Sequence, residues 1–92
     1  MKISVLKLIS GEELIAREVE SLSGVSYSKP RVIQMMQTQQ GMQAGLVPFI
    51  LSAPDDEINI NPNTIVCKVT ANKQIEDAYL SQTSGLDLSG KL

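Results

Sequence analysis

The stretch that decides the fold reads LKLISGEELIA at residues 6–16. It has an apolar segment, a turn and a second apolar segment, and Gly11 supplies the positive φ that a tight turn between strands requires. A second stretch, INPNTIVCKV at residues 60–69, has a turn around Pro62 followed by one more apolar segment. Together they predict the antiparallel strands of a small β-barrel.

Working outward, five segments have the β-branched composition or the alternation of strands. They lie at residues 3–9, 14–20, 31–38, 42–51 and 64–70, with a short extended piece at 58–60. Residues 21–28 are small and polar, which predicts a loop. Pro30 is expected to begin the third strand, where its missing N–H costs least, and Gly45 and Pro48 predict a bend, bulge or edge in the fourth.

After Thr70 the period of the apolar residues changes. Ile75, Ala78, Tyr79 and Gln82 are spaced as one face of a helix, which predicts a helix over residues 72–82. Residues 83–92 have no period and are expected to be a flexible tail. Closely spaced strands with no helix between them favour an antiparallel barrel or sandwich. The chain is therefore predicted to be a single all-β domain over residues 1–82 with a C-terminal helix.

Length and composition narrow the function further. A chain of 92 residues has a thin core, so burial of apolar surface between copies of itself is expected. The lone Cys67 cannot form an internal disulfide and is expected to be buried and reduced, which indicates a cytoplasmic protein. No signal peptide is recognisable at the start, and no apolar run approaches a membrane span. We therefore expect no membrane partner.

The residue types that carry most enzyme chemistry are scarce. The chain has no histidine, a single cysteine and no Gly-rich phosphate loop, so we expect no catalytic residues, no metal site and no cofactor. Asp55, Asp56 and Glu57 have the oxygen ligands that a hard cation prefers. Their spacing lacks the ligand alternation of a calcium loop, which favours solvated acids at a loop tip.

Two further patterns have two interpretations each. The glutamines and methionines of residues 34–43 are consistent either with an adaptable binding surface or with a hairpin whose methionines lie in the core and whose glutamines face water. Tyr27 lies beside Lys29 and Arg31, as an aromatic residue that stacks a base does. Packing over the barrel mouth is the alternative for this tyrosine.

The predicted barrel resembles the Sm-like proteins, a family that includes the bacterial Hfq group. Leu6, Leu8, Gly11 and Ala16 are similar to its first motif, with Ala16 at a position where the family usually has glycine. The segment INPNTI at residues 60–65 is similar in spacing to its second motif, with Asn61-Pro62 in place of Arg-Gly. The likeness spans about residues 3–70 and is nearest to short Sm-like proteins of viral (phage) and marine metagenomic sequences. In a virus, the location would be the host cytoplasm.

The resemblance implies a strongly bent, five-stranded Sm-like barrel of the SH3 type that assembles into a closed ring. The fourth strand of one subunit would pair with the fifth strand of the next, in a ring of roughly five to seven copies. The residues implied at this seam are Val47, Phe49, Leu51, Ile65, Cys67 and Val69. The residues implied at the nucleic-acid site near the pore are Tyr27, Lys29, Arg31, Asn61 and Asn63.

Two functions follow. The first is a ring-forming Sm-like protein that binds RNA or single-stranded DNA without catalysis, as a chaperone or processing factor. In this role Tyr27 would stack, Lys29 and Arg31 would contact phosphate, and Asn61 and Asn63 would read base edges. The second is a protein-interaction or structural ring that binds no nucleic acid, which the formal charge of −2 favours.

Overall fold

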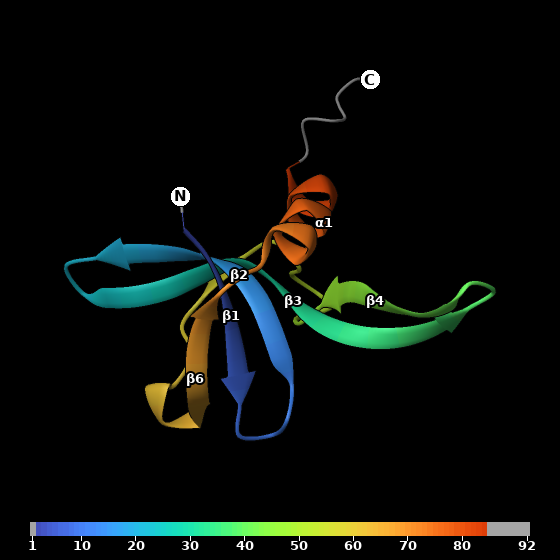
Figure 1. Cartoon of the computed structure of the whole chain (residues 1–92). Helices are drawn as coiled ribbons and strands as arrows, with labels where there is room; N and C mark the ends of the chain where they lie inside the picture. The colour runs from blue at the N-terminus through green and yellow to red at the C-terminus, as the bar shows by residue number, and fades with distance from the viewer. Residues whose placement is uncertain (1, 85–92) are drawn as a thin grey trace.

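The computed structural model describes residues 2–84, in which one antiparallel sheet carries a helix against one face (Figure 1). The elements in chain order are the strands β1 (Lys2–Leu8), β2 (Glu13–Ser21), β3 (Gly24–Thr38), β4 (Gly41–Pro48) and β5 (Glu57–Ile58), the 3-10 turn η1 (Pro62–Thr64), the strand β6 (Ile65–Thr70) and the helix α1 (Lys73–Thr83). The prediction of an all-β domain with a C-terminal helix is confirmed.

The sheet is open, so the prediction of a closed barrel was wrong. Its strands lie in the order β4-β3-β2-β1-β6, and the short β5 pairs with β3 outside this path. Within the described chain β4 pairs only with β3, and β6 pairs only with β1. Closure would require β4 and β6 to hydrogen-bond to each other, whereas they form the two ends of the sheet. Each end therefore has one side without a strand partner, although on β4 the backbone oxygen of Leu46 accepts a hydrogen bond of 3.1 Å from Gln82 Nε2 of α1.

Residues 21–28 were predicted to be a loop, but they form the turn of a β-hairpin and the strand residues that adjoin it. β2 continues to Ser21, β3 begins at Gly24, and the two ends pair directly. Gly24 has φ 128°, a conformation that closes the turn and that other residues rarely adopt. Small polar residues form strands here because the backbone ladder, rather than side-chain propensity, holds the hairpin. As a result β3 is a 15-residue strand that crosses the whole molecule (Figure 1).

A bulge bends β2 and β3 where Pro30 lies. The pairing passes from Ile15–Arg31 to Arg17–Ser28, so that Ala16 faces two residues, Lys29 and Pro30. Lys29 has φ 53°. Pro30 was predicted to begin a strand, but it lies inside β3. A proline is tolerated there because a residue in a bulge does not have to donate a ladder hydrogen bond.

The later elements follow the predictions more closely. β4 ends at Pro48 rather than at residue 51. The missing N–H of this proline removes one ladder bond, and only the N–H of Phe49 still donates to β3, to the backbone oxygen of Pro30 at 3.3 Å. The last strand is β6, one residue shorter than predicted because Thr64 belongs to η1. Thr83 was predicted to begin a flexible tail, but it is the buried last residue of α1. Residues 85–92 of that tail lie outside the described residues.

Helix α1 forms where the spacing predicted it, over residues 73–83 with Asn72 as its N-cap. The Asn72 side chain accepts a hydrogen bond of 2.9 Å from the backbone N–H of Ile75, which satisfies one of the free donors of the first turn. Tyr79 of this helix is fully buried, and its hydroxyl donates to the backbone oxygens of Ser28 and Lys29. No helix among residues 2–84 has the length and apolarity to cross a membrane.

The apolar residues form two clusters on opposite faces of the bent sheet. The first contains Leu6, Leu8, Leu14, Ala16, Tyr27 and Val32, with Val47, Phe49, Ile58, Ile60 and Ile65 packed against it. The second contains Ile3, Ile15, Ala71 and Tyr79, with Val5, Ile33, Leu46, Ile75 and Leu80 packed against it. We call the second cluster the helix-side core, because α1 covers it. Strand alternation divides β1 between the two clusters.

Candidate functional site

Tyr27 lies in the first apolar cluster with 5% of its surface exposed. It stands opposite Ile58 in the pairing of β3 with β5. Its ring therefore packs inside the chain, as in the second of the two interpretations of this residue. Stacking on a base would require the ring to be accessible from solvent.

Lys29 and Arg31 are brought together at the C-terminal end of α1. The Lys29 Nζ donates to the backbone oxygen of Thr83 at 2.9 Å, and the Arg31 Nε donates to Gln82 Oε1 at 2.8 Å. Arg17 joins them from β2, where its Nη2 donates to Thr83 Oγ1 at 3.2 Å. Cations at this end of a helix interact favourably with the free carbonyls and the dipole.

Arg31 is also the link between β3 and the loop that follows β4. Its guanidinium donates to the backbone oxygens of Pro30 and Pro54 and forms an ion pair of 2.6 Å with Asp55, while its side chain is only 7% exposed. The hydrogen bond from Arg31 holds the pKa of Asp55 below its usual value against the opposing effect of desolvation. The charges of Arg31, Lys29 and Arg17 act in the same direction.

The other basic side chains of residues 2–84 also have partners within the chain. Lys2 and Lys68 form ion pairs with Glu18, Lys7 with Glu13, and Lys73 with Asp77. Every lysine and arginine in the described part of the chain thus already contacts a carboxylate, a carbonyl or a hydroxyl. A phosphate-binding surface instead needs cations that are free to meet the ligand.

Asn61 and Asn63 lie elsewhere, Asn61 as the N-cap of the turn η1 before β6 and Asn63 inside that turn, and both are exposed. The Asn61 side chain caps the turn by accepting a hydrogen bond of 3.0 Å from the backbone N–H of Asn63. The structure therefore divides the five predicted nucleic-acid residues among the core, the end of α1 and this turn.

The six residues predicted for the subunit seam fall into two groups. Val47, Phe49 and Ile65 are half-buried against the first apolar cluster. Leu51, Cys67 and Val69 are exposed, with exposed fractions of 82% for Leu51 and 54% for Val69. The expectation of a buried Cys67 was wrong, because β6 is an edge strand whose residues from Val66 to Thr70 are all exposed.

Two of the three acidic side chains at residues 55–57 have partners within the chain. Asp55 is held by Arg31, and Glu57 accepts a hydrogen bond from Ser26. No three His, Cys, Asp or Glu side chains within residues 2–84 are grouped as ligands of a metal ion.

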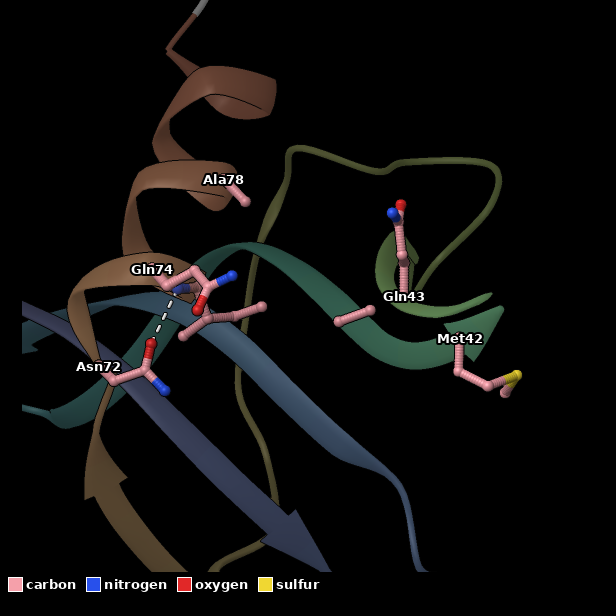
Figure 2. Close-up of a pocket in the computed structure, with 7 residues that line it drawn as sticks. Met42, Gln43, Asn72, Gln74 and Ala78 are labelled. Atoms are coloured by element: carbon pink, nitrogen blue, oxygen red, sulfur yellow. Dashed lines mark hydrogen bonds between the residues drawn. The ribbon is translucent and has the colours of Figure 1, made fainter. Parts of the chain in front are cut away.

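A groove of about 530 Å³ lies between β4 and the start of α1. Figure 2 shows Met42 and Gln43 on the β4 side, and Asn72, Gln74 and Ala78 on the helix side. Its lining is completed by Ala44 and Ile75, so that all seven lining residues are uncharged. Methionine adapts its shape to a partner, and carboxamides both donate and accept hydrogen bonds. The groove is therefore suited to an uncharged protein surface.

Sequence reasoning did not identify this groove. Of its two interpretations for residues 34–43, the one with methionines in the core was wrong, since Met35, Met36 and Met42 are 61%, 40% and 58% exposed. A usable signal was present in the charges, because the whole segment from Val32 to Pro54 contains no Asp, Glu, Lys or Arg.

No protein-family model matches this chain. A search of the curated proteins likewise finds no match.

Proposed function

We propose that this chain is a subunit of a homo-oligomeric, Sm-like ring in which β4 of one copy pairs with β6 of the next, and that the ring serves protein interaction. The observation that carries the proposal is that the two ends of one sheet, β4 and β6, each have one edge without a strand partner. These strands correspond to the fourth and fifth predicted strands, the pair implied by the Sm-like resemblance. A head-to-tail contact between two different edges forms a closed ring when the rotation between copies closes.

The exposed side chains of β6 support the same assembly. Val66 and Val69 are 62% and 54% exposed on a strand of six residues. Native proteins protect edge strands with charges, bulges or covering elements. Here Lys68, the single lysine of β6, forms an ion pair with Glu18 of β2. Pairing with β4 of a second copy would cover both the backbone edge and the valines.

The pairing of the basic side chains favours protein interaction over nucleic-acid binding. Phosphate contacts by Lys29 or Arg31 would have to replace bonds that hold α1 and the loop after β4. The alternative function, binding of RNA or single-stranded DNA, retains the exposed turn with Asn63. Titration of labelled RNA and DNA oligonucleotides at low salt separates the two functions, because phosphate contacts are strongest there. Saturable binding would reverse our choice between them.

The ring is tested by disulfide trapping with the native Cys67. We expect Met42→Cys or Ala44→Cys to form a disulfide with Cys67 of another copy, because all three positions lie on the two edge strands. A non-reducing gel would then show a ladder that ends at the ring, and its last band gives the number of copies. Disulfides require Cα atoms within about 7 Å, so only seam contacts are trapped.

Two control variants make the trapping specific. Leu22→Cys places a thiol at the exposed β2–β3 turn, outside the seam, and we expect no ladder from it. Cys67→Ser combined with Ala44→Cys removes one partner and should abolish the ladder. A monomeric mass in solution together with equal trapping by Leu22→Cys and Ala44→Cys would overturn the proposed ring.

A further inference from the structure

The outer halves of β3 and β4 form an arm, residues 34–44, in which every residue is exposed (Figure 1). The arm has no charged residue, and it carries Met35, Met36 and Met42. A two-stranded ribbon is marginally stable in water by itself. Depletion of charge and enrichment of methionine are typical of the central part of a protein interface. The arm therefore has the composition of a covered surface.

One face of the arm continues the helix-side core. In the pairing of β3 with β4, Ile33 stands opposite Leu46 and Met35 stands opposite Ala44. Directly opposed residues lie on the same face of a sheet, and so do residues two apart on one strand. Ile33 and Leu46 pack under α1, so Met35, Ala44 and Met42 extend the same face beyond the cover of the helix. The groove of Figure 2 lies where this cover ends.

The edge strand β6 carries an exposed residue on the corresponding face. Val69 stands opposite Val5, which packs against the helix-side core. Val69 also lines a neighbouring hollow together with Ile33, Ala71 and Ile75. Val69 is thus an apolar side chain at one end of the sheet, and Ala44 and Met42 are its counterparts at the other end, all on the side that α1 occupies.

We infer that a second copy of this chain closes the groove between β4 and α1, with the second copy's Val69 packed against Ala44 and Met42. This inference rests on the proposed ring and specifies what the groove does in it. Cyclic symmetry keeps the same face of every subunit on the same side of a ring. The helix side of one copy's β6 therefore meets the helix side of the next copy's β4. Because the seven lining residues are uncharged, an apolar edge fits them without leaving a buried charge unpaired.

The inference is tested by placing a charge in the groove. Ala44 is exposed in the single chain, so Ala44→Arg should leave the fold of one subunit intact by circular dichroism. In the assembly the arginine would be buried without a partner, and we expect the dissociation constant between copies to rise about tenfold or more. Gln40→Arg, at the tip of the same arm and outside the groove lining, is the matched control and should change it little.

Methionine oxidation gives a second measurement that needs no variant. In the single chain Met42 is more exposed than Met36. If the groove stays open, peroxide should therefore oxidise Met42 at least as fast as Met36. In the assembled protein we expect the order to reverse, because Met42 is covered and Met36 lies on the other face of the arm. Mass spectrometry after brief peroxide treatment measures both rates.

The outcomes separate this inference from the proposed ring. A wild-type protein that is monomeric at all concentrations overturns both. A stable ring in which Met42 oxidises as fast as Met36, and which Ala44→Arg leaves intact, retains the ring and overturns the closed groove. In that case the groove is open to another partner.

Discussion

At the residue scale, Arg31 is a structural cation. It donates to Pro30, Pro54, Asp55 and Gln82, and so joins β3, the loop after β4 and the last turn of α1. We expect Arg31→Lys to lower the free energy of unfolding by about 1–3 kcal/mol, since a lysine cannot reproduce the planar fork and leaves buried oxygens unsatisfied. Urea unfolding measures this loss. Lys73→Gln removes an exposed helical cation and should cost less than about 0.5 kcal/mol.

An equal loss of stability in these two variants would contradict the structural role of Arg31. The same pair of proteins also bears on nucleic-acid binding. If Arg31→Lys folds normally but loses affinity for an oligonucleotide, the guanidinium contacts phosphate instead.

Glu18 is the second residue with a specific electrostatic role. Its side chain is 2% exposed and accepts hydrogen bonds from Ser4 and Lys68, with Lys2 nearby at 3.8 Å. Burial alone would raise the pKa of Glu18, but these bonds and charges outweigh it and hold the pKa below the ordinary value of 4.5. The hydrogen bond to Glu18 in turn raises the pKa of Lys68. The carboxylate therefore binds three side chains on β1 and β6.

The lowered pKa of Glu18 predicts a dependence of stability on acid. A carboxyl whose pKa is lower in the folded state stabilises that state above its unfolded pKa, and this contribution is lost as the pH falls through the folded-state pKa. We expect the urea concentration at the unfolding midpoint to decrease as the pH falls below about 4.5. Glu18→Gln should weaken this dependence of the midpoint on pH, and should lower the free energy of unfolding by about 1–2 kcal/mol at pH 7. Glu13→Gln removes an exposed ion pair and should leave the curve unchanged. Identical curves for the two variants would contradict the prediction.

At the scale of elements, the stability of α1 depends on its N-cap, Asn72. Asn72→Ala should lower the free energy of unfolding by about 1 kcal/mol, because the N–H of Ile75 loses the side-chain acceptor that caps the first turn of the helix. Thermal unfolding followed by circular dichroism measures this. Gln74→Ala, two residues later and without a capping bond, is the control. If both variants unfold at the wild-type temperature, the Asn72 cap does not stabilise the helix.

The arm of β3 and β4 shows what propensity alone misses at this scale. Alternation correctly located strands on both sides of the turn at Gln39 and Gln40, and Gly41, which begins β4 after this turn, has φ 109°. It did not show which side of the strands is buried, because period 2 assigns residues to two faces without saying which face is covered. The methionines of the arm therefore appeared to be core residues, whereas they are exposed in the single chain.

At the scale of the whole molecule, the open sheet predicts that stability depends on concentration. Anything that binds the folded chain and not the unfolded chain stabilises it by mass action, and a second copy is such a ligand. We expect the melting temperature of the wild type to rise by several degrees between about 1 and 100 μM, and that of Ala44→Arg to rise less. Calorimetry at several concentrations measures both proteins. A melting temperature of the wild type that is independent of concentration would contradict the assembly.

The candidate site was predictable only in part. The edge strands were found, because residues 42–51 and 64–70 have strand composition and Pro48 limits the first of them. The pairing of Lys29 and Arg31 with the end of α1 was not predictable, since it joins residues about 50 positions apart through a bulge at Pro30. Side chains that appear free in a sequence acquire partners only when distant elements are packed together.

By itself, the sequence determined the strand-rich class, the turn at Gly11 and the C-terminal helix, because these depend on side chains within a few residues of one another. Only the tertiary structure decided that the sheet stays open, that Tyr27 and Arg31 are buried, and that Cys67 and the methionines of the arm are exposed. These properties depend on which strand lies next to which. Strand order is set by contacts between distant residues, which local patterns do not specify.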